Sequence, residues 1–407
     1  MTLAASRAPR AALARAVDAL VDDAYLQASS AAVTYVGTHC TAILEALEWR
    51  RCVDAYPQGA TAEQLGEALD VPTDRRPALA WILAKAAATG PWVKASFPQA
   101  SSPQDSAEVH YSPGEEPGQD LTNTALWSIG RHRDGVGSTI PMIEYIAARY
   151  PAFLRGEKSG AAILLKGEGL TLWEDYFAAA NPLYEIHNQA LALGVDDILE
   201  RLGRPARILE LGAGTGGGTA AVTGRLSSQP ENVEDYLLSD IAPSFLVRIL
   251  ERLGATELPL RRKRVDFTQP LIRQGIEPAS FDLILAVNAL HNTPDLAATV
   301  QYLATALSDD GWLVLSESIC QTGEHVHQDF IFNLLPAMPH GTGLGDAEEE
   351  ILGADSADDQ QDQIDAPSRF FSAAQWSRIF DVLHLDAEIY INHQGPELAL
   401  LALARLR

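Results

Sequence analysis

The spacing of apolar side chains changes character along the chain. From about Leu26 to Pro113 it is helical, and Thr41–Trp49 presents one apolar face. The segment Thr61–Leu69 opens with a threonine followed three residues later by a glutamine, which is the spacing of a capping box. A further helix is predicted over Pro77–Thr89.

Two short strands are predicted next, Pro91–Lys94 and Glu108–Tyr111, on either side of a Pro/Ser-rich loop. Three helices followed by a small hairpin are typical of a winged-helix module. From Asn123 to Leu202 the spacing is helical again. We therefore expect a winged-helix-like domain over 1–118 and a helical connector over 119–202.

The rhythm changes again at Arg207, where short apolar runs alternate with helical stretches, as in a βαβ parallel sheet. The expected strands are Arg207–Leu211, Tyr236–Ser239, Arg264–Asp266, Leu283–Val287, Trp312–Ser316, Ala387–Asn392 and Leu398–Ala404. The last two flank His393–Pro396, a hairpin signal. The predicted fold class is α/β, with a Rossmann-like, mostly parallel seven-stranded sheet and a C-terminal antiparallel hairpin over 203–407.

Charge narrows the range of partners. The 54 acidic and 30 basic residues give a net charge of −24, with a pI of about 4.7. Such a surface repels phosphate backbones and acidic headgroups, so neither nucleic acid nor a membrane surface is an expected partner. Residues 346–365 carry nine acidic side chains and no basic one, which predicts a solvated loop.

Cysteine and histidine usage argues against disulfides and metals. Cys40, Cys52 and Cys320 are scattered and odd in number, so a reducing cytoplasm is the expected compartment. His325 and His327 form a pair without a third ligand at helical spacing, so no metal is expected. Arginines interrupt the alanine-rich N-terminus, so no apolar run there is long enough for a signal or membrane-spanning segment. A helix is expected, and an organelle transit peptide is the alternative.

The first chemical motif is the glycine-rich turn of Ala206–Gly218, between a strand and a helix. Glycines let the backbone turn with positive φ and approach a ligand closely. Gly212, Gly214 and Gly217 also satisfy the G-x-G-x-x-G pattern of dinucleotide sites, and a purely structural turn is the other alternative. Glu210 discriminates, because its carboxylate suits the cationic amine of S-adenosylmethionine and repels a pyrophosphate.

Acidic residues also end the next two predicted strands. Asp240 is placed to accept the ribose hydroxyls, although an acid there can also cap a helix. In this fold an acid at Asp266 reaches the adenine amino group with Phe267 against the ring; an ordinary surface aspartate is the alternative. The expected cofactor-binding residues are Glu210, Gly212, Ala213, Gly214, Thr215, Gly216, Asp240, Ile241, Asp266, Phe267 and Asn288.

A histidine and a glutamate follow two neighbouring strands. His291 comes three residues after Asn288, and Glu317 follows the next strand. Adjacent strand ends lie only about 5 Å apart, so Glu317 is expected to hydrogen-bond one imidazole nitrogen and leave the other as a base. A structural role is the alternative for each. The expected substrate contacts are Tyr176, Tyr184, His187 and Phe332, within walls formed by the aromatic helices and residues 328–338.

These motifs resemble a known group. Leu209–Thr219, Ser239–Ile241 and Phe281–Asp295 look like the class I methyltransferase domains of polyketide and nonribosomal peptide synthases, and the resemblance covers roughly Pro151 to the C-terminus. In carbon-methylating members, a His in an Asn-x-Leu-His motif and a downstream Glu form a catalytic dyad. His291 and Glu317 match those positions. The N-terminal module is similar to that of small-molecule O-methyltransferases, a resemblance that implies a role in dimerisation or as a lid for 1–118 and an active-site cover over 119–202.

The leading hypothesis is a free-standing, cytoplasmic methyltransferase that uses S-adenosylmethionine to methylate carbon in an acyl or β-keto intermediate of natural-product biosynthesis, of the polyketide type. The substrate is expected either free or tethered to a carrier protein, and a homodimer is plausible. The alternative is O-methylation of a phenol, enol or carboxylate. A third hypothesis, a winged-helix regulator without activity, is disfavoured by the intact glycine turn and its acids.

Overall fold

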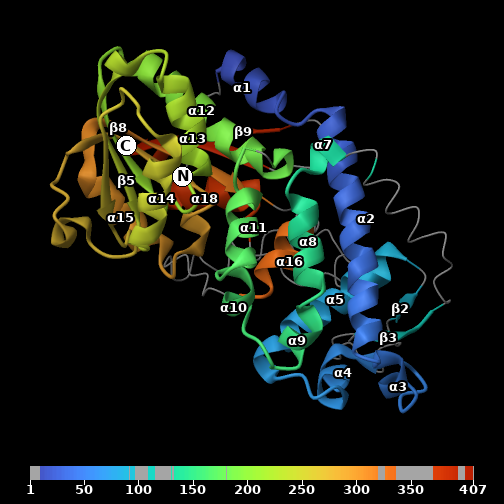
Figure 1. Ribbon diagram of the computed structural model, residues 1–407. Helices are drawn as coiled ribbons and strands as arrows, with labels where there is room; N and C mark the ends of the chain where they lie inside the picture. Colours follow the sequence, from blue (N-terminus) through green and yellow to red (C-terminus); the bar gives the residue numbers. More distant parts are fainter. Residues whose placement is uncertain are drawn as a thin grey trace, which may run out of the picture.

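The computed structural model describes residues 10–90, 92–96, 109–114, 130, 133–179, 181–319, 326–335, 370–392 and 399–406. The predicted acidic loop 346–365, the hairpin tip 393–396, His325 and Cys320 lie outside these ranges. Figure 1 shows a larger sheet with its covering helices on one side of the molecule and most of the N-terminal helices on the other.

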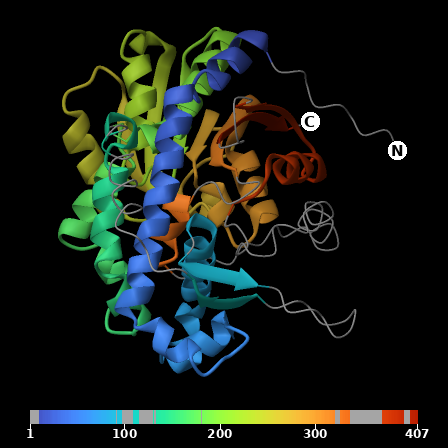
Figure 2. The same ribbon diagram turned by 90° about the vertical axis from the view of Figure 1, so that its right-hand side faces the viewer.

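The N-terminal half is mainly helical. Its elements are α1 (Ala11–Asp18), α2 (Asp23–Ala46), α3 (Trp49–Val53), β1 (Ala60–Thr61), α4 (Ala62–Ala68), η1 (Thr73–Arg75), α5 (Arg76–Thr89), β2 (Val93–Ser96), β3 (His110–Pro113), α7 (Arg133–Val136), α8 (Thr139–Ala147), α9 (Tyr150–Leu154), α10 (Gly160–Leu164), α11 (Glu168–Tyr176) and α12 (Pro182–Leu202). Figure 2 shows α2 running most of the length of the molecule, from the level of the large sheet toward the small strands.

Local sequence signals explain several of these boundaries. The Thr61 hydroxyl accepts a hydrogen bond from the Gln64 amide N–H at 3.2 Å, and the Gln64 side chain accepts one from the Thr61 N–H at 2.9 Å, which confirms the predicted capping box. Strands β2 and β3 pair antiparallel, each beginning about two residues later than predicted, and β1 joins them in the order β1-β3-β2. The helices predicted over 61–69 and 77–89 are thus present as α4 and α5, and the hairpin gains one strand. The helix predicted over 41–49 was misplaced, because that stretch spans the end of α2 and the start of α3, and Glu48 between them has a left-handed φ of 57°.

The larger sheet has seven strands in the order β6-β5-β4-β7-β8-β10-β9. They are β4 (Ala206–Leu211), β5 (Val233–Asp240), β6 (Leu260–Arg264), β7 (Phe281–Val287), β8 (Leu307–Ser318), β9 (Leu385–Ile391) and β10 (Ala399–Leu406). The first five are parallel, and β10 pairs antiparallel with both β8 and β9. This confirms the predicted mostly parallel sheet with its C-terminal hairpin.

The strand predicted at Arg264–Asp266 was misplaced. The observed β6 is Leu260–Arg264, with the sequence Leu-Arg-Arg-Lys-Arg. It is an edge strand, hydrogen-bonded to β5, and edge strands carry charged side chains that discourage further pairing. It therefore lacks the apolar run by which the other strands were recognised, and Asp266 lies two residues beyond its end.

Helices cover both faces of the sheet. Successive strand residues point to opposite faces, so neighbouring residues pack against different helices. Ile208 of β4 packs in a core with α1, α12, α13 (Gly217–Leu226) and α14 (Pro243–Leu253). Leu209, the next residue, packs in the core that includes α15 (Leu296–Ala306) and α18 (Ala373–Val382). Short turns η2 (Pro230–Asn232), η3 (Leu271–Gln274) and η4 (Leu290–Asn292) complete the connections.

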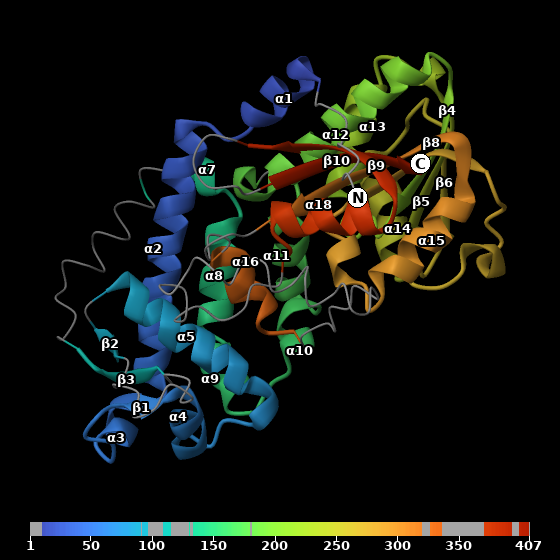
Figure 3. The same ribbon diagram turned by 180° about the vertical axis from the view of Figure 1, so that it is seen from behind.

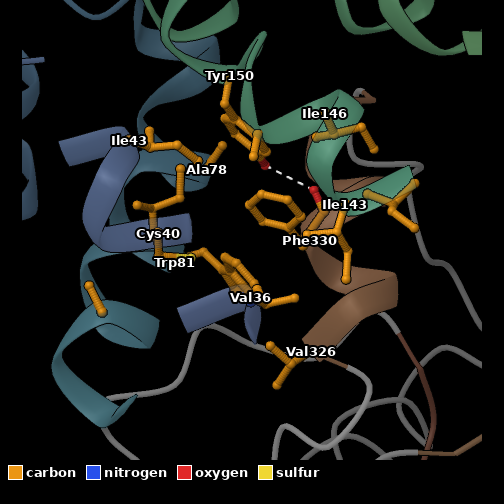
Figure 4. Packing of buried hydrophobic residues seen from close by; sticks show 14 of the residues in the cluster. Val36, Cys40, Ile43, Ala78, Trp81, Ile143, Ile146, Tyr150, Val326 and Phe330 are labelled. Carbon is orange, nitrogen blue, oxygen red and sulfur yellow. Dashed lines mark hydrogen bonds between the residues drawn. The ribbon is translucent and has the colours of Figure 1, made fainter. Parts of the chain in front are cut away.

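One helix belongs to the sheet region by sequence but to the helical region by packing. Helix α16 (Val326–Phe332) follows β8 in the chain yet lies beside α2 and α8, as Figures 1 and 3 both show. In Figure 4 the Phe330 ring lies between Trp81 and Tyr150. It stacks on Tyr150 with centroids 4.9 Å apart, and the Tyr150 hydroxyl donates to the Phe330 carbonyl at 3.1 Å. Helix α16 is thus part of the N-terminal core.

That core is a single cluster of packed residues that includes both Val21 and Ile186, so described residues on both sides of position 118 share it. Helix α12 contributes its first residues to this core and Ala190–Leu199 to the core of the sheet. The division into domains at 118 and 202 stays a prediction. Within the described part of the chain, no helix has the length and apolarity to cross a membrane.

Candidate active site

A cavity of about 250 Å³ opens where the strand order reverses, between the carboxyl ends of β4 and β7. Ligands of open α/β sheets bind at this kind of switch point. The lining residues come from both strand ends, the glycine turn and helices α11, α12 and α16: Trp173, Phe177, Tyr184, Asn188, Glu210, Gly212, Ala213, Gly214, Thr215, Gly217, Gly218, Val287, Asn288, His291, Asn292, Gln328, Phe332 and Phe370.

The glycine turn needs its glycines for two reasons. Gly212, Gly214 and Gly216 have φ of 57°, 52° and 85°, a region that residues with a Cβ rarely adopt. A Cβ on Gly216 would lie 2.6 Å from the Ile249 side chain, and one on Gly217 would lie 2.2 Å from the Phe177 carbonyl oxygen. The turn is therefore held tightly between α14 and the aromatic segment that forms the far wall of the cavity.

Glu210 brings a buried carboxylate to the cavity wall. It is 3% exposed, accepts hydrogen bonds from the hydroxyls of Thr219 at 2.9 Å and Tyr236 at 2.7 Å, and has no basic side chain as a partner among the described residues. Burial raises the pKa of Glu210 to about 7, and those two hydrogen bonds only partly oppose it. A cationic amine in the cavity would supply the missing charge, so this site fits the amino group of S-adenosylmethionine.

Four other predicted cofactor residues, all at or beyond the ends of β5 and β6, lie outside the cavity lining. The Asp240 carboxylate accepts from the backbone N–H groups of Gly214 at 2.9 Å and Ala242 at 2.7 Å. Ile241 is exposed, and Asp266 accepts from the hydroxyl of Thr268 at 2.6 Å. The Phe267 ring would be 3.4 Å from a Cβ on Gly212. Asp240 and Phe267 thus border the glycine turn, whereas the contacts of Asp266 lie within its own loop.

His291 and Glu317 form a buried pair. The His291 Nδ1 lies 2.5 Å from one oxygen of Glu317, whose other oxygen accepts from the Leu290 N–H at 3.0 Å. The Asn292 amide nitrogen lies 2.9 Å from His291 Nε2. An amide N–H can only donate, so the network assigns the proton to Nδ1 and a lone pair to Nε2. Both side chains are buried, and the His291 ring lines the cavity.

Asn288 connects the two walls. Its φ of 46° lies in the left-handed region, which asparagine tolerates better than most residues. Its side-chain oxygen accepts from the Ser318 N–H at 2.5 Å, and its amide nitrogen donates to the Tyr184 hydroxyl at 3.0 Å. It therefore ties the ends of β7 and β8 to helix α12, and Tyr184, a predicted substrate contact, lines the cavity.

The remaining predicted substrate contacts differ in whether they line the cavity. Phe332 lines the cavity, whereas Tyr176 and His187 are buried behind the wall. Tyr176 shares a 2.6 Å hydrogen bond with His327 Nδ1, and His187 Nε2 lies 3.2 Å from the Ser318 hydroxyl. Of the predicted wall segment 328–338, the described residues 328 and 332 reach the cavity, and 336–338 lie outside the described ranges.

Sequence reasoning missed Asn188, Asn292 and Phe370 as lining residues. The Phe370 ring lies edge-on to His291 with centroids 5.1 Å apart. The available signal was the aromatic pair of residues 370 and 371 directly before Ser372, which caps α18. Elsewhere in the described chain, no group of three or more His, Cys, Asp or Glu side chains is arranged to hold a metal ion.

Comparisons with known proteins agree with this geometry. A family model described as "Methyltransferase domain" matches residues 209–313. The polyketide synthase PksR of Bacillus subtilis is 28% identical over 48% of the chain, and the highly reducing polyketide synthase FUM1 of Gibberella moniliformis is 30% identical over 54%. The chain spans only 8% of the length of each synthase. Methyltransferase calH of Penicillium decumbens is 32% identical over 58% of the chain and 62% of its own length.

Solved structures share the fold over nearly the whole chain. The CurJ carbon methyltransferase has a TM-score of 0.70 at 18% identity, with 97% of this chain and 96% of that chain covered. The CMeT domain of the citrinin polyketide synthase has a TM-score of 0.69 at 18% identity, with 99% of both covered. The glycine turn, the fold and the matched domain lead to one conclusion: this chain is an S-adenosylmethionine-dependent methyltransferase of the class I fold.

Proposed function

We propose that this methyltransferase acts on carbon, at the acidic α-position of a β-ketoacyl thioester, free or tethered to a carrier protein. The observation that carries the proposal is the buried His291–Glu317 pair, which borders the same cavity as Glu210 and the glycine turn. A carboxylate or a phenolate acceptor needs little help to attack a methyl group, whereas a C–H bond must first lose its proton to a base.

The cofactor would be held by this chain's own groups along the strand ends. Glu210 would take the amino group, and the backbone of the turn at Gly212–Gly216 would approach the carboxylate and sulfur. Asp240 would take the ribose hydroxyls, and Asp266 with Phe267 would contact the adenine. When bound, the cofactor supplies a methyl group already activated by its sulfonium charge.

The histidine is arranged to take a proton. Glu317 accepts from Nδ1–H, which fixes the tautomer and the ring orientation and stabilises the imidazolium that forms. Nε2 then receives the α-proton of the substrate. In the structure the Asn292 amide donates to that nitrogen, so the amide must turn aside as the substrate enters. The aromatic wall of Trp173, Phe177 and Phe332 keeps water from the reacting carbon.

Similarity supports the same reading. The polyketide synthases PksR and FUM1 match about half of this chain, and the solved structures that cover it almost completely include domains named as carbon methyltransferases. Under this proposal the chain works in polyketide-type biosynthesis.

The test is methyl transfer to acetoacetyl-N-acetylcysteamine with isotope-labelled cofactor. We expect the label on the α-carbon, and His291→Ala should lower kcat at least about a hundredfold because a general base typically contributes that much. Cofactor affinity should change less than about threefold. His39→Ala is the matched control, since His39 lies in α2 against Tyr35 and is not a lining residue of the cavity. Label found on oxygen, or a His291→Ala variant with near-normal kcat, would contradict the proposal.

A further inference from the structure

The side chain of Gln328 in α16 borders the cavity and carries an unused hydrogen-bond donor. Gln328 is 1% exposed and lines the cavity together with His291 and Glu210. Its amide nitrogen is shut off from water, yet it has no hydrogen-bond partner among the described residues. A buried amide N–H without an acceptor is unfavourable for folding, and such groups are uncommon in native proteins.

The oxygen of the same amide has one long hydrogen bond. The Ser318 hydroxyl lies 3.4 Å from Gln328 Oε1, near the upper limit for a hydrogen bond. Ser318 follows Glu317 directly on β8, and its backbone N–H donates to Asn288. The acceptor oxygen of Gln328 is thereby directed toward the end of β8, which leaves the nitrogen as the free end.

Other amides of the lining already have protein acceptors. Asn188 donates to Glu185 at 2.8 Å, Asn288 to the Tyr184 hydroxyl, and Asn292 to His291. Gln328 differs from all three in having no such acceptor. The terminal torsion of glutamine is broad, so this amide is free to turn its nitrogen toward an acceptor that enters the cavity.

We propose that the Gln328 amide donates a hydrogen bond to a carbonyl oxygen of the acyl acceptor, and holds that oxygen more strongly once it becomes an enolate. This rests on the proposed carbon methylation. The α C–H bond breaks, its proton goes to His291 Nε2, and its electron pair moves through the α-carbon to the carbonyl oxygen. The negative charge therefore develops on an oxygen, where a preorganised N–H donor stabilises it.

The assignment also specifies the substrate class. The acceptor carries a carbonyl next to the reacting carbon, as a β-ketoacyl thioester does. A phenol offers no such oxygen apart from the nucleophile itself.

The experiment separates enolate formation from methyl transfer. The full-length enzyme, with S-adenosylhomocysteine bound, is incubated with acetoacetyl-N-acetylcysteamine in deuterated buffer, and enzyme-dependent α-proton exchange is followed by mass spectrometry. Methylation kcat and KM are measured separately with S-adenosylmethionine. The variants are Gln328→Leu and Gln328→Glu, the second of which keeps an acceptor for Ser318 while it removes the donor. Gln301→Leu, at an exposed position of α15, is the control.

We expect both Gln328 variants to lose about a hundredfold in exchange rate and in kcat, as for removal of one oxyanion donor, while KM changes less than about tenfold. Cofactor affinity should be unchanged, and Gln301→Leu should behave as wild type. If the wild type methylates the α-carbon and folded Gln328→Glu keeps its exchange rate and kcat within about threefold, the role of Gln328 is overturned and the proposed function stands. If the wild type neither exchanges the α-proton nor methylates carbon, both proposals fail.

Discussion

A buried carboxylate lies at each end of the parallel sheet, and the two differ in whether neighbouring side chains compensate their charge. Asp282, at the start of β7, is fully buried and accepts from the guanidinium groups of Arg204 and Arg207, both at 3.0 Å. Burial raises the pKa of Asp282, but the hydrogen bonds from Arg207 and Arg204 outweigh it and hold the pKa well below its usual range. Here the negative charge is compensated within the protein.

Glu210 lies at the opposite end of the neighbouring strand β4. Among the described residues its carboxylate accepts side-chain hydrogen bonds from two neutral hydroxyls, and burial raises its pKa to about 7. The difference teaches which end of the sheet serves which purpose. The end away from the cavity uses its charges for stability. The end at the cavity holds an uncompensated carboxylate, and the positive charge that it lacks is one that a ligand can bring.

The largest effect is expected at the compensated end. Asp282→Asn should lower the free energy of unfolding by about 3 kcal/mol, because it removes the buried carboxylate that two arginines share, although Arg204 keeps its contact with Asp310. Chemical denaturation measures this, and cofactor affinity should stay within about twofold. Asp310→Asn is the matched control: Asp310 contacts the same Arg204 but is largely exposed, so it should cost less than about 1 kcal/mol. Equal losses from the two variants would remove the distinction.

Glu210→Gln should keep the stability of the protein and lower its affinity for the cofactor, the reverse of Asp282→Asn. We expect a stability equal to or higher than that of wild type at pH 8, because a buried charge is removed, together with a loss of cofactor affinity of about a hundredfold, because the charged partner of the amine is gone. Calorimetric titration with S-adenosylhomocysteine reports the affinity. Glu388→Gln is the control, since Glu388 is equally buried but paired with Arg201 at 2.6 and 2.8 Å. It should lose stability and keep its affinity; unchanged affinity in Glu210→Gln would refute the role of Glu210.

The smallest effect is a pH dependence. Because the pKa of Glu210 is raised in the folded state, the protein should lose folding stability as the pH rises from about 4.5, the pKa of the unfolded carboxyl, to about 7, its pKa in the folded protein. Binding of a cationic amine needs the ionised form, so cofactor affinity should rise about tenfold between pH 6 and pH 8, with proton release at the lower pH. Titrations in buffers of different ionisation enthalpy measure both. Glu210→Gln should abolish the dependence, and a flat wild-type profile would break the comparison.

The sequence predicted best what is local. Each cofactor or catalytic candidate at the cavity lies within or just after a short strand motif. The placement of Glu210, Asn288 and Glu317 on one edge of a parallel sheet could therefore be deduced, as could that of Asp240 and the glycine turn. The edge strand β6 was misplaced because Leu-Arg-Arg-Lys-Arg has no apolar period. Its neighbours bury both faces, whereas an exposed edge strand does not need apolar residues.

The far wall of the cavity was harder to predict, because it is assembled from distant segments. Nothing in the sequence says that Phe370 meets His291, or that Tyr176 turns to His327 and away from the cavity. Both contacts depend on how the helices pack, and an aromatic residue at helical spacing fits a core and a cavity wall equally well. Gln328 fell within the predicted wall segment 328–338, but for the same reason the sequence did not single it out from its neighbours.

Helix α16 has a consequence for how this architecture can be exchanged between proteins. Its Phe330 is packed into the N-terminal core, whereas its neighbours Gln328 and Phe332 border the cavity at the sheet. A chimera joined near residue 202 would give the sheet region of one parent an α16 shaped for the helices of the other. The natural unit of recombination therefore comprises two separate stretches of chain, and a swap that transfers residues 326–332 with the N-terminal helices should yield far more folded protein than one that leaves them behind.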